Sequence, residues 1–191
     1  MPLAYFKRYR MEFDLRHTPL PGDSLADGFE FVQWGEEWLE EHAVVKSRSF
    51  AGTVDARVFR CLGEISGCRN LMRLITGRVD FLPAGTWLAL SRANEFAGAV
   101  PCGTIQAVTP TSNVGVIQNV AVLPEFRGFG VGSALIAKSL RGMHEAGMKR
   151  AALEVTSQNE SALRLYERLG FVRTRTAYKS VKVPKRRTVT A

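Results

Sequence analysis

Apolar and polar residues follow one another in the second half of the chain in a pattern typical of alternating strands and helices. The run 114–122 is uncharged and rich in β-branched residues, which predicts a buried strand. Pro124 cannot extend a strand ladder, and the glycines of 127–132 favour a turn. One face of a helix is then expected from the apolar residues Val131, Leu135, Ile136, Leu140 and Met143. This region therefore predicts a strand, a glycine-rich turn and a helix that ends near residue 146 or 147.

A second strand and helix follow. Residues 151–156 form an apolar run that contains one charge, Glu154, and predict a further strand. One face of the next helix is expected from Ala162, Leu165, Tyr166 and Leu169. Gly170 stands where a helix commonly ends, and 171–183 predict a last extended segment.

The first half of the chain predicts strands at 29–32, 86–91 and 102–108, with helices at 34–48 and 69–75. Antiparallel strands followed by a β-α-β-α-β series predict an α/β fold. Its central sheet should be mixed and mostly antiparallel, with helices on both faces.

One domain is expected from the length of 191 residues, and we place it at 28–183. Residues 1–27 predict an irregular N-terminal arm, and 184–191 a basic C-terminal tail. The segment 50–67 is expected to be rich in loops, and 94–98 to turn between two strands.

The glycine-rich turn at 127–132 has the features of an anion site. Backbone N–H groups at a helix N-terminus are unpaired, and together with the helix dipole they favour a phosphate. Glycines let the backbone approach the phosphate oxygens closely. The spacing matches neither the dinucleotide pattern G-x-G-x-x-G nor the Walker pattern G-x-x-x-x-G-K-[ST]. On this stretch alone, a glycine-rich turn without a ligand is the alternative.

Two stretches together resemble the Gcn5-related N-acetyltransferase (GNAT) family. Arg127, Gly130 and Gly132 fill the family's acyl-CoA signature Q/R-x-x-G-x-G/A. Residues 153–171 resemble its later motif, L-E-V-x-x-x-N-x-x-A-x-x-L-Y-x-x-x-G-F. The resemblance is specific from residue 114 to about 183 and loose before that.

The resemblance implies a GNAT fold and direct transfer of an acetyl group from acetyl-CoA to an amine. It implies a diphosphate site on the turn, with Ser133 as an additional donor, and a strand 116–122 whose backbone pairs with the pantetheine arm. An N–H near Val122 would polarise the thioester carbonyl. The implied cofactor-binding residues are Val120, Ala121, Val122, Arg127, Gly128, Phe129, Gly130, Val131, Gly132, Ser133, Asn159 and Tyr166.

Tyr166 and Glu154 are the implied catalytic residues. Tyr166 matches the family tyrosine that protonates the CoA thiolate, and its alternative role is an aromatic packed on a helix face. Glu154 fills the position of the general base proposed in the branch that acetylates protein N-terminal alanines, and its alternative role is to order a neighbouring strand. Asn159 is a ligand of the pantetheine arm or a helix N-cap, and Ser157 with Glu160 is a rival capping box.

The net charge of +8 suits an anionic partner such as CoA. Nucleic acid is the rival partner, but the basic residues gather near the two ends of the chain rather than on one helix, so none is expected. The acidic residues Glu36, Glu37, Glu40 and Glu41 would attract a cationic amine or form a solvated helix face. The acceptor stays open between a small molecule and a protein N-terminus, and a non-catalytic acyl-CoA-binding regulatory module is the alternative function.

Three scattered cysteines favour a reducing cytoplasm over a disulfide scaffold, and no metal-ligand spacing is present. Charged residues begin at Lys7, so the N-terminus has no apolar segment typical of a signal peptide. Prolines divide the uncharged run 96–124, so no membrane span is expected. The oligomeric state stays open, with a homodimer among the alternatives.

Overall fold

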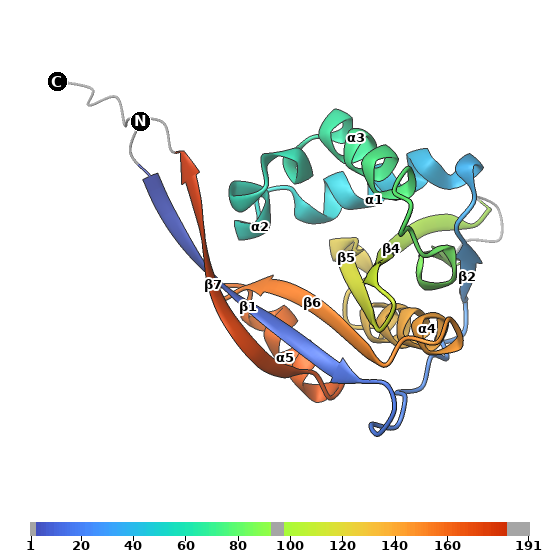
Figure 1. Ribbon diagram of the computed structural model, residues 1–191. Coiled ribbons are helices and arrows are strands. Elements are labelled where there is room, and N and C mark those ends of the chain that lie inside the picture. The colour runs from blue at the N-terminus through green and yellow to red at the C-terminus, as the bar shows by residue number, and fades with distance from the viewer. Residues whose placement is uncertain (1–2, 93–97, 183–191) are drawn as a thin grey trace, which may run out of the picture.

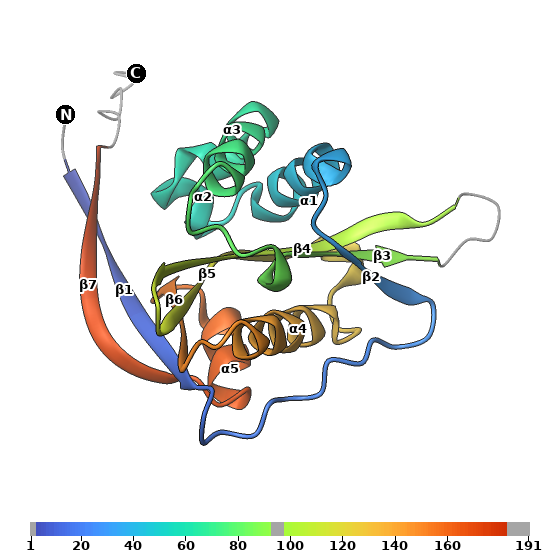
Figure 2. The same ribbon diagram turned by 45° about the vertical axis from the view of Figure 1, so that its right-hand side comes forward.

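The computed structural model describes residues 3–92 and 98–182, which form a seven-stranded sheet between two layers of helices (Figures 1 and 2). The strands are β1 (Leu3–Asp14), β2 (Phe29–Gln33), β3 (Trp87–Ser91), β4 (Val100–Thr111), β5 (Val114–Val122), β6 (Arg150–Thr156) and β7 (Val172–Lys182). The α-helices are α1 (Leu39–Phe50), α2 (Val54–Val58), α3 (Ile65–Thr76), α4 (Val131–Glu145) and α5 (Glu160–Arg168). Short 3₁₀ turns cover Glu36–Trp38, Arg60–Gly63, Pro83–Gly85 and Pro124–Phe126.

The strand order is β2-β3-β4-β5-β6-β1-β7, and the pairing is antiparallel except between β5 and β6. Helices α1, α2 and α3 cover one face, and α4 and α5 cover the other (Figure 2). The predicted α/β architecture, with its mixed and mostly antiparallel sheet, is therefore confirmed.

The prediction that residues 1–27 are irregular is wrong for 3–14. These residues form β1, which lies between β6 and β7 and pairs antiparallel with both. Met11 and Phe13 are fully buried, whereas Arg8 and Arg10 point to the opposite face, where α2 and α3 lie. The period-two alternation of apolar and charged residues is the signature of a half-buried strand, and the high charge of this segment obscured it.

Two further differences concern the segment 50–67, which was expected to be mainly loop. Helix α2 begins there, because the Thr53 hydroxyl accepts a hydrogen bond from the Ala56 amide at 3.3 Å. Helix α3 begins at Ile65, four residues before the predicted start at residue 69. The turn expected at 94–98 and the tail at 184–191 lie largely or wholly outside the described residues.

Helix α4 packs against the sheet as its apolar spacing predicts. The side chains of its expected inner face are at most 1% exposed; they are Val131, Leu135, Ile136, Leu140 and Met143. This packing fixes the N-terminus of α4, and the glycine-rich turn before it, at the end of β5.

Strands β5 and β6 separate toward their carboxyl ends. They are paired only where residues 114–116 of β5 face residues 150–152 of β6. A register shift against β4 leaves Gln118 as an extra residue in β5, which is the pattern of a β-bulge. Beyond the paired segment, β5 is bonded to β4 on one side, and its other edge faces the opening between the two strands. This opening positions the candidate site.

Candidate functional site

The turn before α4 exposes unpaired main-chain amides. Gly128 and Gly130 have φ values of 87° and 79°, in the left-handed region that glycine adopts without strain. Gly130 is the N-cap residue of α4, and no side chain caps this end of the helix. Within the described residues, the N–H groups of 128–133 make no hydrogen bond, whereas the Arg127 amide donates to the Pro124 carbonyl at 3.2 Å. Six consecutive amides of the turn and the first helical turn are thus available to an anion.

A cavity of about 750 Å³, which we call the turn cavity, lies against these amides and the end of β5. It is lined by all but one of the residues predicted to bind the cofactor: Val120, Ala121, Val122, Arg127, Gly128, Gly130, Val131, Gly132, Ser133, Asn159 and Tyr166. The exception is Phe129, whose side chain is 57% exposed and lies against the ring of Phe29, with 5.9 Å between the ring centres.

Arg127 holds the turn to neighbouring elements. Its guanidinium donates to the carbonyl of Val122 at 3.1 Å and to that of Ser49 at 3.2 Å. The nearby ion pair between Arg48 and Glu125, at 2.6 Å, also joins α1 to the segment before the turn. The side chain of Arg127 therefore links β5 to α1, in addition to bringing a positive charge to the edge of the turn cavity.

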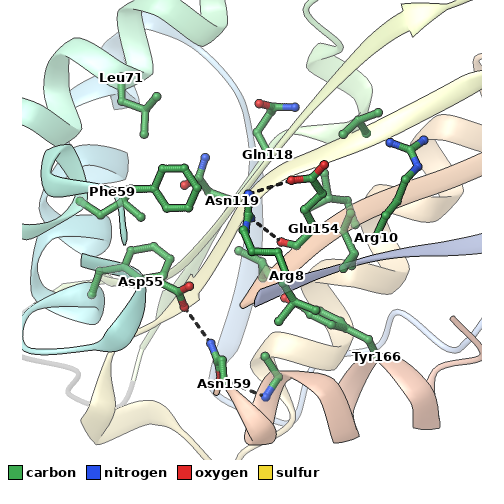
Figure 3. Close-up of a pocket in the computed structure, with 18 of the residues that line it drawn as sticks. Arg8, Arg10, Asp55, Phe59, Leu71, Gln118, Asn119, Glu154, Asn159 and Tyr166 are labelled. Carbon is green, nitrogen blue, oxygen red and sulfur yellow. Dashed lines mark hydrogen bonds and ion pairs between the residues drawn. The ribbon is translucent and has the colours of Figure 1, made fainter. Parts of the chain in front are cut away.

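A second cavity of about 440 Å³ lies between β1, β5 and β6 on one side and α2 and α3 on the other (Figure 3). We call it the charged cavity, because Arg8, Arg10, Asp55 and Glu154 line it. It shares several lining residues with the turn cavity, namely Phe50, Asp55, Val120, Asn159, Ala162 and Tyr166. The two cavities therefore meet beside α5.

Tyr166 stands at this junction. It is 8% exposed, and its ring packs on Phe171 with 5.9 Å between the centres. Burial, and secondarily the charge of Asp55, raises the pKa of the Tyr166 phenol well above its usual value. The hydroxyl is therefore protonated at neutral pH and can donate a proton or a hydrogen bond.

Asn159 is the N-cap of α5, since its Oδ1 accepts a hydrogen bond from the Ala162 amide at 3.2 Å. Ser157 and Glu160, the rival capping box, do not provide the cap. The Asn159 Nδ2 donates to Oδ2 of Asp55 at 2.9 Å (Figure 3). Oδ1 of Asp55 accepts a hydrogen bond from the Thr156 hydroxyl at 2.7 Å. Asp55 therefore connects α2 to the segment between β6 and α5.

Glu154 points from β6 into the charged cavity. Its side chain is 46% exposed, and its Oε2 accepts a hydrogen bond from Nη1 of Arg8 at 2.7 Å. Nη2 of Arg8 donates to the Glu154 main-chain carbonyl at 3.2 Å. Glu154 is thus tolerated in an apolar strand because its side chain lies on the face that lines a cavity and pairs with Arg8 of β1.

Sequence reasoning missed Arg8, Arg10 and Asp55. For the two arginines a signal existed, because charged residues at positions 8, 10 and 12 alternate with apolar ones. For Asp55 no local signal exists, since its partners lie about a hundred residues further along the chain.

The acidic helix face and His42 lie outside both cavities. None of the glutamates of that face lines either cavity, and Glu40 pairs with Arg69 at 2.6 Å. His42 is fully buried, and its Nδ1 lies 2.6 Å from the hydroxyl of Thr104. Burial, and secondarily the charge of Lys46, lowers the pKa of His42 to about 3, so the ring is neutral. His42 is thus a core residue.

The sequence of the chain is similar to a known family of acetyltransferases and to curated proteins with that activity. A family model described as "Acetyltransferase (GNAT) family" matches residues 65–171. A mycothiol acetyltransferase of Thermobispora bispora is 32% identical over 164 residues, which are 82% of this chain and 50% of that protein. N-alpha-acetyltransferase 30 of Schizosaccharomyces pombe is 35% identical over 97 residues, which are 51% of this chain and 63% of that protein. The chain thus spans between half and two thirds of the length of these two curated relatives.

Solved structures share the fold at low sequence identity. A GCN5-related N-acetyltransferase of Sphaerobacter thermophilus has a TM-score of 0.66 and 18% identity, over 92% of this chain and 50% of that one. The aminoglycoside N-acetyltransferase AAC(6')-Iy, solved in complex with CoA, has a TM-score of 0.60 and 19% identity, over 83% of this chain and 95% of that one.

Among the residues that the structure describes, no helix is long and apolar enough to cross a membrane.

Proposed function

Because the chain belongs to the acetyltransferase (GNAT) family, we propose that it transfers the acetyl group of acetyl-CoA directly to an amine bound in the charged cavity. The observation that carries this proposal is the row of free amides at 128–133, which faces a cavity that shares lining residues with a second, charged one. The first cavity suits a phosphate-bearing donor, and the second suits an acceptor. Tyr166 and Asn159 line both, so the reacting groups would meet between them.

In this proposal the amides of 128–133 bind the diphosphate of CoA, and the Ser133 hydroxyl adds a donor. The pantetheine arm lies along the unpaired edge of β5 and bonds to its backbone like an added strand. Val120, Ala121 and Val122 line that edge, and an N–H near Val122 polarises the thioester carbonyl. The thioester is then close to the junction at Tyr166.

The nitrogen lone pair of the neutral amine attacks the thioester carbon, and the Glu154 carboxylate takes the one proton that the nitrogen loses as the new bond forms. The new C–N bond forms, the tetrahedral intermediate collapses, and the C–S bond breaks. The Tyr166 hydroxyl, which burial keeps in its protonated form, donates its proton to the departing thiolate. Tyr166 is reprotonated as Glu154 releases its proton. The ion pair with Arg8 holds the Glu154 carboxylate in place for its part in this cycle.

The test is CoA thiol release on a panel of amines, with Tyr166→Phe and Glu154→Gln as the informative variants. We expect each to lower kcat by roughly 10²–10⁴-fold, because each removes one proton transfer. The matched controls are Tyr178→Phe and Glu167→Gln, which lie outside both cavities and should keep wild-type kcat. Undiminished turnover in both informative variants would remove these residues from the mechanism. Saturable acetyl-CoA binding without turnover of any amine would instead identify a non-catalytic acyl-CoA-binding module.

A further inference from the structure

Arg10 and Glu154 are cross-strand neighbours of opposite charge that do not pair with each other. They face one another in the register of β1 and β6, and both line the charged cavity. Opposite charges at such positions usually attract across the strands. Here, however, Nε of Arg10 donates to Oε1 of Glu12 at 2.8 Å, and Oε2 of Glu154 accepts from Arg8. Among the described residues, the two Nη atoms of Arg10 and Oε1 of Glu154 have no hydrogen-bond partner.

The other two charges of the cavity are engaged by the protein, although within the described part of the chain Nε of Arg8 is buried without a hydrogen-bond partner. The Arg8 guanidinium stacks on the Phe59 ring, 4.7 Å from its centre, and both its Nη atoms bond to Glu154. Both carboxylate oxygens of Asp55 accept hydrogen bonds, from Thr156 and Asn159. The cavity therefore offers a ligand one cationic contact at Arg10 and one anionic contact at Glu154, next to each other on adjacent strands (Figure 3).

From this juxtaposition we infer that the acceptor of the proposed transfer is an amine that carries a carboxylate close to its nitrogen. The inference rests on the proposed function and specifies its substrate class. The carboxylate would bond to the free Nη atoms of Arg10, a geometry that a planar guanidinium suits. The amine would lie at Oε1 of Glu154, on the side of the cavity that Tyr166 also lines.

Size and charge both favour this class over other amines. A cavity of about 440 Å³ has room for a free amino acid or the first residues of a peptide. A polyamine would place a second positive charge beside Arg10, and an amino sugar without an acidic group would cover the guanidinium without pairing its free Nη atoms. Either would leave a charged group desolvated without a partner, which disfavours binding.

Two sources of the same chemistry exist, a free amino acid and a peptide N-terminus followed by an acidic side chain. The experiment therefore compares two matched pairs of acceptors by CoA release. Alanine is compared with alaninamide, which lacks the carboxylate, and the amide of Ala-Asp is compared with the amide of Ala-Asn. We expect transfer to prefer the acidic member of at least one pair, and that pair identifies the source.

The variant Arg10→Gln should lower the acidic-to-neutral ratio of kcat/KM by at least about tenfold in that pair, because it removes one charge-assisted contact. The two amines of a pair differ in basicity, but this difference is the same for the wild type and the variant. It therefore cancels when the ratio of the variant is divided by the ratio of the wild type. The matched control is Arg150→Gln, since Arg150 contacts the same Glu12 at 3.5 Å but does not line the cavity. That variant should leave the ratio unchanged, and both variants should bind acetyl-CoA as the wild type does.

Three results would overturn the inference while acetyl-CoA still binds. They are a ratio that Arg10→Gln does not alter, transfer confined to amines without a carboxylate, and no transfer to any of the four acceptors. Failure of the proposed function itself would look different, because the wild-type protein would then either show no acetyl-CoA binding by calorimetry or bind it without acetylating any amine of the wider panel.

Discussion

Lys46 is fully buried on α1, and among the described residues its ammonium nitrogen has no carboxylate partner. Its Nζ lies 2.9 Å from the sulfur of Met72. Burial lowers the pKa of Lys46 to about 7, and the nearby Cys68 and Cys61 offset only part of this effect. Between that value and the ordinary lysine pKa near 10.4, the unfolded chain binds one more proton than the folded one. The free energy of unfolding should therefore rise with pH across this interval. Below pH 7 it should be lowered by the full cost of burying the charged Lys46 ammonium.

We predict that Lys46→Met stabilises the fold most at low pH and removes this dependence. The difference in unfolding free energy between variant and wild type should shrink by about 2 kcal/mol from pH 7 to pH 9, since each pKa unit corresponds to about 1.4 kcal/mol. Urea unfolding at pH 7 and at pH 9 measures this difference, and Lys149→Met, at an exposed lysine, is the control. A difference that is the same at pH 7 and pH 9 would show that Lys46 does not titrate in the folded state over this range.

At the residue scale, the sequence predicted side chains that belong to local motifs. Asn159 lies at a helix N-terminus, where it was one of two candidate caps, and Tyr166 lies on the inner face of that helix, as the apolar spacing predicted. Arg8 pairs with Glu154 across 146 positions of the chain, and no local pattern encodes such a contact. The pairing of Arg8 with Glu154 therefore could not be predicted from the sequence.

At the scale of elements, two glycines with the same backbone conformation bracket α4. Gly130 precedes the helix with φ of 79°, and Gly147 follows it with φ of 82°. A Cβ at either position would meet no atom within 4 Å, so a substitution would suffer the same backbone strain without a clash. Of the two, Gly130 lines the turn cavity and Gly147 does not.

We expect Gly130→Asp to weaken acetyl-CoA binding by at least about a hundredfold, because it places a carboxylate where the diphosphate should bind. Gly147→Asp is the control and should bind acetyl-CoA like the wild type, with a similar loss of thermal stability from the shared strain. Isothermal titration calorimetry gives both affinities. Equal binding by the two variants would contradict the assignment of the turn.

Elements with long periodic patterns were predicted well, and those that depend on a cap or on distant pairing were not. Strand β5, helix α4 and helix α5 follow from hydrophobic spacing. Helix α2 has five residues and depends on its Thr53 cap, and β1 is defined by its pairing with β6 and β7. These contacts form only in the folded chain.

At the scale of the whole molecule, the first strand of the chain lies next to the last one and completes the candidate site. Strand β1 separates β6 from β7 and brings two arginines to the face where β5 and β6 open (Figure 1). The charged cavity itself is balanced, because Arg8 and Arg10 face Asp55 and Glu154, so the net charge of +8 comes from residues elsewhere and suits a polyanionic donor. The strand order could not be predicted, since periodicity identifies strands but not their neighbours.

The central claim is that the main-chain amides of 128–133 bind the diphosphate of acetyl-CoA. Amide chemical shifts of the ¹⁵N-labelled protein, followed by NMR during titration with acetyl-CoA, test this most directly. We predict that these six amides shift among the most strongly and saturate together, while the Gly147 amide at the other end of α4 stays unchanged. Saturable binding of acetyl-CoA that leaves the 128–133 amides unmoved would contradict the account.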